Sequence, residues 1–372
     1  TYDNNGNISR IGYSVYVYDE AGQLIKNLDS RNGNGVQYTY DKGGNIVSID
    51  KLEKGLKTEN IGTYVYGNAN WKDLLTEYNG NEITYDEIGN PLTYYNGTEL
   101  KWTMGHRLKS AVRSDGVKIK YTYNADGLRT SKTINNVKFN YYWNENKLTG
   151  QTFGGNTMYF RYDGDTLIGF EYNNNQYYYV TDLQGDIIAI LNSNGNCVAE
   201  YKYDSWGNCT VTKDTEYIAS VNPLRYRGYY FDSDTGLYYL QSRYYDSNTG
   251  RFINADDFDM LQYGVGNLFA YCDNNPVMRE DKGGQFWNII VGAVIGGGLE
   301  LAGQLLSGKS LSEVNWAKVG VSAVSGGLTA AVGPVAGCIV SGATDVAMDA
   351  LDGNIHSVAD AAESFVWGTA KA

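Results

Sequence analysis

Proline, cysteine and basic residues are scarce in this chain. Only 4 of its 372 residues are Pro and 4 are Cys, whereas Gly reaches 45 and Tyr 34. The cysteines (Cys197, Cys209, Cys272 and Cys338) have no CxxC spacing and no nearby His, so the sequence lacks the pattern of a zinc site. A disulfide between Cys197 and Cys209 stays open as an alternative to free thiols. We expect no metal ion and no cofactor.

The shortage of basic residues gives the chain a net charge of -12 and a pI near 4.7. Binding to nucleic acid regardless of its sequence requires a basic surface that neutralises phosphates. We therefore expect no nucleic acid to bind the repeat region described next.

A Tyr-Asp pair followed by a glycine-containing turn recurs through the first half of the chain. Where the copies are densest they lie about 20 residues apart, a spacing found in repeat architectures. The pairs are Tyr2-Asp3, Tyr18-Asp19, Tyr40-Asp41, Tyr85-Asp86, Tyr162-Asp163 and Tyr203-Asp204, with the variant Tyr123-Asn124.

Each repeat predicts a strand, a turn and a second strand. Val36, Tyr38 and Tyr40 alternate along the chain and would share one strand face, and residues 46–49 would open the return strand. Asp and Asn bond their own backbone in turns, and Gly accepts a positive φ, so the D-x-x-G-N block has hairpin chemistry. One hairpin cannot bury its Tyr face alone, so neighbouring hairpins must stack.

Tyrosine should be the main packing residue of this structure. Its ring can join an aromatic ladder while its hydroxyl reaches water, which suits a sheet facing a wet interior. We expect residues 1–280 to form one continuous antiparallel sheet, coiled around an interior space, with almost no helix.

The segment from Asn222 to Asp257 reads NPLRYRGYYFDSDTGLYYLQSRYYDSNTGRFINADD. Following a long series of YD repeats, it resembles the core of the Rhs/YD-repeat family; Trp102 in LKWTMGHRL and the stretch near Tyr123 are also typical. The resemblance covers residues 1–284. It implies that the repeats build a hollow antiparallel β-shell, that the core plugs the end of the shell, and that an exported toxin follows.

Three domains are expected from these patterns. Residues 1–221 are repeats and residues 222–284 are the core. From Gln285 on, Tyr disappears and Ala, Gly and Val take over at helical spacing, so residues 285–372 should form a Gly/Ala-rich helical pre-toxin or toxin segment. The chain opens in mid-repeat without Met, which indicates a fragment without its export signal.

A candidate reaction centre lies in the core, at Arg243, Asp256 and Asp281, the last of these shortly after the NNPV motif (Asn274–Val277). Spacing alone also fits a structural ion pair between Arg243 and Asp256, with Asp281 as a loop acid. The resemblance implies that the three form an intramolecular aspartic protease. Two carboxylates held close cannot both ionise, so one keeps a proton and the other activates water.

The site of the cut departs from the family pattern. The resemblance implies cleavage after D-x-x-G-L, whereas this chain reads D-K-G-G-Q from Asp281 to Gln285. If the centre is active, the cut should fall between Gln285 and Phe286. A pocket shaped for Leu would have to bury an amide there, so we expect self-cleavage to be impaired or absent.

The glycine-rich tail allows several interpretations. Residues 286–306 and 317–342 are apolar enough for membrane contact, so residues 286–343 could insert in a bilayer or pack as a soluble helical hairpin. Asp352, His356, Asp360 and Glu363 lie at helical spacing and could bind a metal or form a solvated face. Residues 286–372 hold three Lys, no Arg and seven acidic residues, which does not suit a nuclease.

Three functions fit the sequence. The first is a bacterial, secreted or cell-surface toxin carrier, whose shell holds its own C-terminal effector. Its partners would be an immunity protein and a secretion apparatus or cell wall. The second is a cell-surface adhesion or glycan-binding protein. The third is a pore-forming toxin that acts through the glycine-rich tail.

Overall fold

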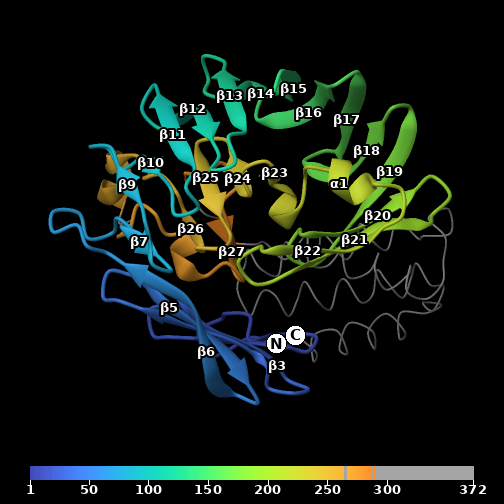
Figure 1. Cartoon of the computed structure of the whole chain (residues 1–372). Coiled ribbons are helices and arrows are strands. Elements are labelled where there is room, and N and C mark those ends of the chain that lie inside the picture. Colours follow the sequence, from blue (N-terminus) through green and yellow to red (C-terminus); the bar gives the residue numbers. More distant parts are fainter. Residues whose placement is uncertain (264–265, 286–287, 290–372) are drawn as a thin grey trace, which may run out of the picture.

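The computed structural model describes residues 1–263, 266–285 and 288–289. In these residues the fold is mainly antiparallel β-structure, arranged in two large sheets, a four-stranded sheet and a two-stranded sheet. Neighbouring strands in each sheet are consecutive in the sequence, so each sheet is a meander. Figure 1 shows the two large sheets surrounding the four-stranded one.

The two large sheets are formed by the repeat region. The first has eight strands: β1 (Arg10–Ile11), β2 (Ser14–Tyr18), β3 (Leu24–Asp29), β4 (Gly35–Tyr40), β5 (Ile46–Glu53), β6 (Leu56–Val65), β7 (Glu77–Tyr78) and β8 (Asn81–Glu82). The second has fourteen: β9 (Thr84–Tyr85), β10 (Pro91–Thr93), β11 (Glu99–Thr103), β12 (Arg107–Val112), β13 (Lys118–Tyr123), β14 (Arg129–Ile134), β15 (Val137–Asn144), β16 (Lys147–Phe153), β17 (Asn156–Asp163), β18 (Thr166–Tyr172), β19 (Asn175–Thr181), β20 (Ile187–Asn192), β21 (Cys197–Tyr203) and β22 (Cys209–Asp214).

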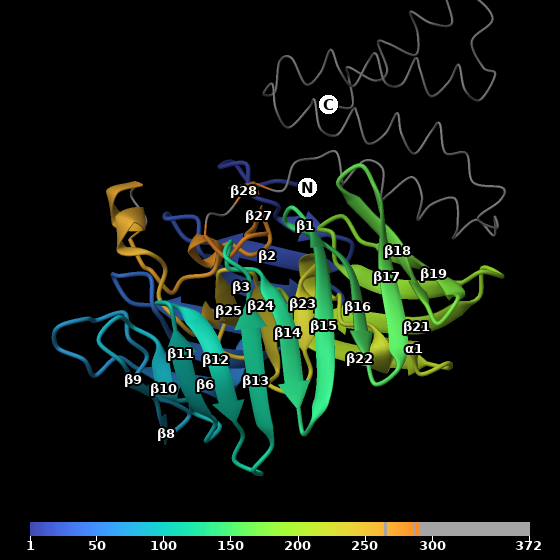
Figure 2. The same ribbon diagram turned by 90° about the horizontal axis from the view of Figure 1, so that it is seen from above.

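Residues 222–284 are called the core segment from here on. Its strands lie inside these two sheets, whereas residues 257–259 are exposed. Figure 2 shows the hairpins of β12–β15 side by side in front of the core strands. The core strands are β23 (Tyr230–Asp232), β24 (Leu237–Leu240), β25 (Arg243–Asp246), β26 (Arg251–Phe252) and β27 (Arg279–Glu280), the last paired with β28 (Asn288–Ile289). The described helical pieces are α1 (Ile218–Val221) and the 3-10 segments Tyr226–Gly228, Phe258–Tyr263 and Cys272–Asn274.

The predicted turn chemistry is confirmed in detail. In the turn between β4 and β5, the Asp41 carboxylate accepts the backbone N–H groups of Gly43 and Asn45 at 2.8 and 2.9 Å. Gly44 has φ 76°, in the left-handed region where Gly carries no Cβ penalty. The Asp41 N–H closes the turn by donating to the Asn45 carbonyl at 2.9 Å.

The same backbone closure from the first to the fifth residue is found in eight turns that begin with Asp or Asn. These are residues 3–7, 19–23, 41–45, 86–90, 124–128, 182–186, 192–196 and 204–208. The turns at 182–186 and 192–196 were not among the predicted pairs because no Tyr precedes them. Asp163 differs from its prediction, because β17 and β18 are joined by the two-residue turn Gly164-Asp165.

The tyrosines that precede the turns, apart from the exposed Tyr2, do not send their hydroxyls to water, contrary to our expectation. Tyr40 Oη donates to the Leu24 carbonyl at 2.6 Å, one repeat earlier in the chain. Six other tyrosines do the same at 2.8 to 3.1 Å, namely Tyr18, Tyr66, Tyr85, Tyr123, Tyr162 and Tyr203. A partly buried hydroxyl needs a partner, and a carbonyl near the start of the preceding return strand provides it. The indole N–H of Trp102 fills the same role toward Pro91.

The two large sheets, β1–β8 and β9–β22, are called the wall from here on. They are not the single continuous sheet that we expected. The ladder breaks between β8 and β9, because residues 81–82 pair back with β7 whereas residues 84–85 pair forward with β10. Ile83 lies at this break, and its buried side chain joins the core cluster. In the described residues, the interior of the wall is filled by the core segment, and one hydrophobic cluster includes wall and core side chains together.

The two ends of the wall meet, and the core segment ties them together. Asn27 on β3 donates to the Ser205 hydroxyl near the last strand at 2.6 Å. From the NNPV motif, Asn274 Nδ2 donates to the Gly44 carbonyl at 2.7 Å, while the Val277 carbonyl accepts Gln184 Nε2 at 2.7 Å. The motif therefore joins early turns of the wall to a late one.

The expected tail lies largely outside the described residues. Asn288–Ile289 form β28, with Ile289 opposite Arg279, so the chain continues as a strand where we expected a helix from residue 286. The predictions for membrane contact at 286–343 and for metal binding at Asp352, His356, Asp360 and Glu363 concern residues that are not described. No helix in the described part of the chain is long and apolar enough to cross a membrane.

Candidate active site

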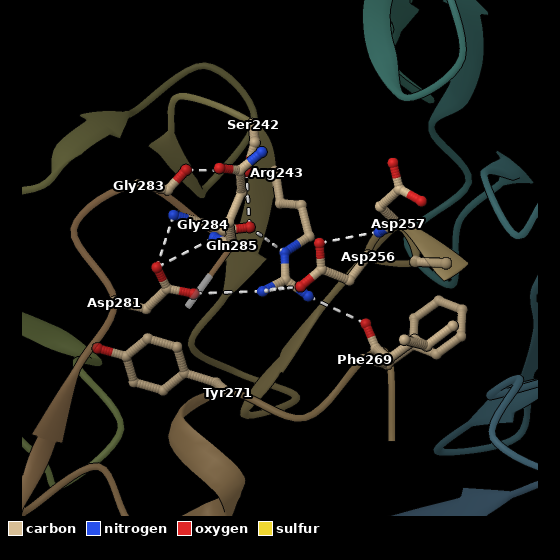
Figure 3. A network of polar contacts seen from close by, with 12 residues as sticks. Ser242, Arg243, Asp256, Asp257, Phe269, Tyr271, Asp281, Gly283, Gly284 and Gln285 are labelled. Carbon is tan, nitrogen blue, oxygen red and sulfur yellow. Dashed lines mark hydrogen bonds and ion pairs between the residues drawn. The ribbon is translucent and has the colours of Figure 1, made fainter. Parts of the chain in front are cut away.

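The structure brings Arg243, Asp256 and Asp281 together within the core segment (Figure 3). Arg243 is the first residue of β25, Asp256 follows β26, and Asp281 directly follows β27. Three separate pieces of the core thus each supply one charged group. All three residues are buried, with 5 % exposure or less.

Both carboxylates contact the same nitrogen of the arginine. Nη2 of Arg243 lies 3.0 Å from Asp256 Oδ2 and 3.2 Å from Asp281 Oδ2. The arrangement is therefore a buried ion triplet in which one cation bridges two anions. Sequence spacing had left a structural pair of Arg243 with Asp256 alone as an alternative, and the structure includes Asp281 as well.

The remaining faces of the Arg243 guanidinium are also occupied. Nη1 donates to the Leu268 carbonyl at 3.0 Å, and Nε donates to the Gly284 carbonyl. The guanidinium carbon lies 3.5 Å from the centre of the Phe252 ring, a cation–π contact. Because Arg presents its donors in a rigid plane, these contacts fix its orientation and link the ion triplet to residue 284.

Burial shifts the protonation of this site. Removal from water raises the pKa of Asp256 to about 6, against the opposing effect of the Arg243 charge, and the neighbouring charge of Asp281 raises it further. Burial likewise lowers the pKa of the Arg243 guanidinium, although both carboxylates oppose that change. Asp256 is therefore the group in this site that can hold a proton at mildly acidic pH.

A proton shared directly between the two carboxylates, as in the expected acid pair, does not describe this geometry. Among the hydrogen bonds of the described residues, none joins Asp256 to Asp281, and Arg243 Nη2 contacts both. Asp256 Oδ1 instead accepts the Asp257 N–H at 2.9 Å. Each carboxylate therefore contacts Arg243 directly and makes no hydrogen bond to the other carboxylate.

Asp281 also builds the turn that leads to the expected cut. Its Oδ1 accepts the N–H groups of Gly284 and Gln285 at 2.7 and 3.1 Å, while Oδ2 faces Arg243. Its own N–H donates to the Tyr229 hydroxyl at 2.9 Å. The acid that faces the arginine is thus the same residue that shapes residues 281–285.

Gln285 does not occupy a buried pocket, contrary to our expectation. Its side chain is exposed, although its backbone N–H is bound to Asp281. An exposed amide stays hydrated, so the cost that we assigned to burying it does not arise. The substitution of Leu by Gln therefore provides no reason, on this ground, to expect that cleavage is impaired.

Sequence reasoning missed two polar residues that hold this turn. Ser242 Oγ lies 2.8 Å from the Gly283 carbonyl and 2.6 Å from the Gly284 carbonyl. Tyr229, which caps Asp281, is itself hydrogen-bonded to Tyr271 Oη at 3.0 Å. The only sequence signal for Ser242 is that it directly precedes Arg243, and Tyr229 has none among 34 tyrosines.

A second buried charge cluster provides a useful contrast. Arg129 on β14 forms an ion pair with Asp232 on β23, and Lys132 lies 2.8 Å from the same carboxylate. Four tyrosine rings surround the Arg129 guanidinium at 4.3 to 5.4 Å, those of Tyr121, Tyr141, Tyr230 and Tyr239. This cluster ties the wall to the core segment. It contains two cations, Arg129 and Lys132, whereas the Arg243 site contains one. Unlike the Arg243 site, it is not next to the segment 281–285 that leads to the expected cut.

The three cysteines in the described part of the chain form no disulfide bond. Cys197, Cys209 and Cys272 are free thiols. Cys197 begins β21 and Cys209 begins β22, and because these strands are antiparallel, the two residues lie at opposite ends of the pair. The disulfide that the sequence had left open is therefore not formed. Searching the described residues gives no group of His, Cys, Asp and Glu side chains suited to a metal ion.

Comparisons with known proteins place this site in context. The family model described as Teneurin YD-shell matches residues 1–277. The tRNA nuclease WapA of Bacillus subtilis is 34 % identical over 289 residues, and the tRNA3(Ser)-specific nuclease WapA of Bacillus spizizenii is 33 % identical over the same length. Each match covers 74 % of this chain and 12 % of the relative.

A solved structure has the same fold. The crystal structure of TcdB2-TccC3-Cdc42 aligns with a TM-score of 0.60 and 21 % identity, over 77 % of this chain and 17 % of the solved chain. The region in common is thus a small part of much longer proteins.

Proposed function

Since the chain belongs to the Rhs/YD-repeat family, with the YD-shell region at residues 1–277, we propose that it is the end of a toxin shell. In this proposal the wall and the core segment enclose a C-terminal effector, which is delivered in bacterial competition. The observation that carries the proposal is the position of the core segment inside the wall, where the NNPV motif ties early turns to a late one.

The proposed division of the chain follows from that arrangement. Residues 1–221 form the wall, residues 222–284 the core that closes it, and residues 285–372 begin the cargo. The WapA relatives are named as tRNA nucleases, which supports the proposal that proteins sharing this region carry an effector activity elsewhere in the chain. We propose a secreted or cell-surface protein, with an immunity protein and a secretion apparatus or cell wall as its partners.

The Arg243 site would act once, as an intramolecular protease that frees the cargo. Water attacks the carbonyl carbon of Gln285, the bond from that carbon to the Phe286 nitrogen breaks, and the products are a carboxyl group on Gln285 and an amine on Phe286. One carboxylate accepts the proton of water and the other donates a proton to the leaving nitrogen. No cofactor is needed for this hydrolysis.

The geometry supports a division of roles between the two acids. Asp256 has its pKa raised to about 6, so it is the group suited to donate a proton at mildly acidic pH. Asp281 faces Arg243 through Oδ2 and holds the N–H of Gln285 through Oδ1, so it is placed to act as the base beside the bond. Arg243 would orient both carboxylates.

The test is the intact mass of the purified chain during long incubation, compared with Asp256→Asn and Gln285→Leu variants. We expect the parent chain to split after Gln285, and Asp256→Asn to stay whole. If only Gln285→Leu splits, the centre is active and the glutamine at position 285 prevents cleavage in the parent chain. If neither splits, the assignment of a protease to this site is wrong.

A further inference from the structure

Ser242 contacts the chain directly before the bond that we propose is cut. It lies with Gln241 in the short turn that joins β24 to β25. Its N–H is 3.2 Å from the Gly283 carbonyl, and its hydroxyl faces the carbonyls of both Gly283 and Gly284 at 2.8 and 2.6 Å. One residue thus contacts two consecutive peptide groups of the turn (Figure 3).

The turn that carries Ser242 is held in one conformation. Gln241 has φ 61°, in the left-handed region that side chains other than Gly seldom adopt. The Ser242 N–H also lies 2.7 Å from the Leu240 carbonyl, and Gln241 Nε2 donates to the Asn146 carbonyl on the wall at 3.0 Å. Because these contacts restrain the turn, they also hold the Ser242 hydroxyl in place against the carbonyls of residues 283–284.

Gly284, on the other side of this contact, is also closely packed. Gly284 has φ 72°, and a Cβ built on it would lie 2.6 Å from the Leu240 carbonyl oxygen and 2.8 Å from Ser242 Oγ. A larger residue therefore has no room at this position. Residue 284 is one peptide before the proposed cut. The contact between the Gln241-Ser242 turn and Gly284 therefore fixes the position of the chain next to that bond.

We propose that Ser242 is a positioning residue for self-cleavage, which sets the register of residues 283–285 against the two acids. The inference rests on the proposed function and adds a specificity element to it. Ser242 takes no part in bond breaking, because its hydroxyl faces carbonyl oxygens as a donor. An intramolecular protease depends on holding one bond in register, and a small displacement loses much of the rate.

The experiment compares Ser242→Ala with the parent chain, with Ser242→Thr, which keeps a hydroxyl, and with Ser247→Ala. Ser247 is another buried serine of the core segment and serves as the matched control. Samples taken after a pulse of synthesis are analysed by intact mass, which gives the rate and the bond that is cut. We expect Ser242→Ala to slow cleavage by roughly ten- to a hundredfold and to spread it over neighbouring bonds.

Two further readouts separate positioning from general damage. The pH dependence of the rate should keep its midpoint in Ser242→Ala, because the acids themselves are unchanged. In an Asp256→Asn background, where no cut is expected, hydrogen exchange of a peptide covering residues 281–285 should be faster with Ser242→Ala. Ser242→Thr should restore the parental rate and exchange in large part, and Ser247→Ala should change neither.

The outcomes distinguish this inference from the one on which it rests. If the parent chain and Gln285→Leu both stay intact, the self-cleavage and the role of Ser242 are both overturned. If the parent chain splits and Ser242→Ala splits at the same bond and rate, Ser242 has no positioning role, while the proposed function stands. Unchanged exchange at residues 281–285 in Ser242→Ala also overturns the present inference alone.

Discussion

Two turns of this molecule have nearly the same sequence and opposite environments. DKGGN at residues 41–45 joins two strands of the wall, and DKGGQ at residues 281–285 leads to the proposed cut. In both, an Asp carboxylate accepts two backbone N–H groups, and the fourth residue is Gly with a positive φ. In the wall turn Asp41 is exposed and Asn45 is buried, whereas in the core turn Asp281 is buried and Gln285 is exposed.

The difference lies in which end of the turn the core segment holds. Asn45 accepts hydrogen bonds from Arg251 and Asn267 of the core segment, at 3.1 and 2.7 Å. Asp281 is held by Arg243 instead. Local chemistry forms the turn in both places. Tertiary contacts then decide whether the Asp is only a turn former or also a buried charge, and the second arrangement leaves residue 285 exposed.

The largest expected effect comes from removing the cation that distinguishes the core turn. Arg243→Met would leave two buried carboxylates without their partner. Such a loss costs about 3 to 5 kcal/mol of unfolding free energy. Urea unfolding monitored by tyrosine fluorescence measures this. Arg31→Met, which removes an ion pair from the surface, is the control and should leave the unfolding midpoint in place. Equal midpoints for the two variants would contradict the buried triplet.

A second prediction concerns the pH dependence of the unfolding free energy, to which Asp256 should contribute. The folded chain holds the Asp256 proton up to about pH 6, whereas the unfolded chain loses it near pH 4. Because the folded pKa is the higher one, this stabilisation is complete at low pH and is lost as the pH rises through 6. The expected loss is about 2 to 3 kcal/mol.

The measurement is the unfolding free energy of the parent chain and of Asp256→Asn from pH 4 to 7. The difference between the two curves isolates Asp256, since groups such as Asp186, with its pKa raised by burial to about 7, contribute to both. Ser247→Ala, which alters a buried side chain of the core segment that does not titrate between pH 4 and 7, is the matched control and should run parallel to the parent chain. A constant difference between parent and Asp256→Asn would show that the proton is not held at Asp256.

The smallest effects test the fifth residue of each turn. Asn45→Ala should destabilise the chain by about 2 kcal/mol, because Arg251 and Asn267 lose a buried acceptor. Gln285→Ala should change the unfolding free energy by less than about 0.5 kcal/mol, because its side chain is exposed. Both variants are compared by urea unfolding in the Asp256→Asn background, where no cut is expected. If Gln285→Ala destabilises the chain more than Asn45→Ala, the core segment does not hold the fifth residue of the wall turn and the first residue of the core turn as described.

The wall was predictable because its information is local. The residues that form a D-x-x-G-N turn are neighbours in the sequence, and the alternation around Tyr38 marks the strand that precedes one such turn. The break at Ile83 was not predictable, because it depends on which neighbouring strand each short segment pairs with. The partner of the Tyr40 hydroxyl was missed for the same reason, since it belongs to the preceding repeat.

The candidate site was predictable only as a set of residue types. Resemblance indicated Arg243, Asp256 and Asp281, and the structure brings them together, but the bridging by a single nitrogen needed coordinates. Ser242 and Tyr229 give no pattern of their own, because each contacts one short segment that lies far along the chain. The exposure of Gln285 follows from the burial of Asp281 at the other end of its turn, which no local sequence rule states.

The hydrogen bonds of the NNPV motif have a consequence for the order of folding. Asn275 reaches the Gly22 carbonyl across 253 residues, and Asn274 reaches Gly44 across 230. Hairpins of the wall form from near neighbours, whereas contacts of such separation form late, after the entropy of closing a long loop has been lost. In the function that we propose, the acids of the core segment would therefore meet the bond after Gln285 only when the wall is complete. The late formation of these contacts would then delay the proposed release of a cargo until folding is finished.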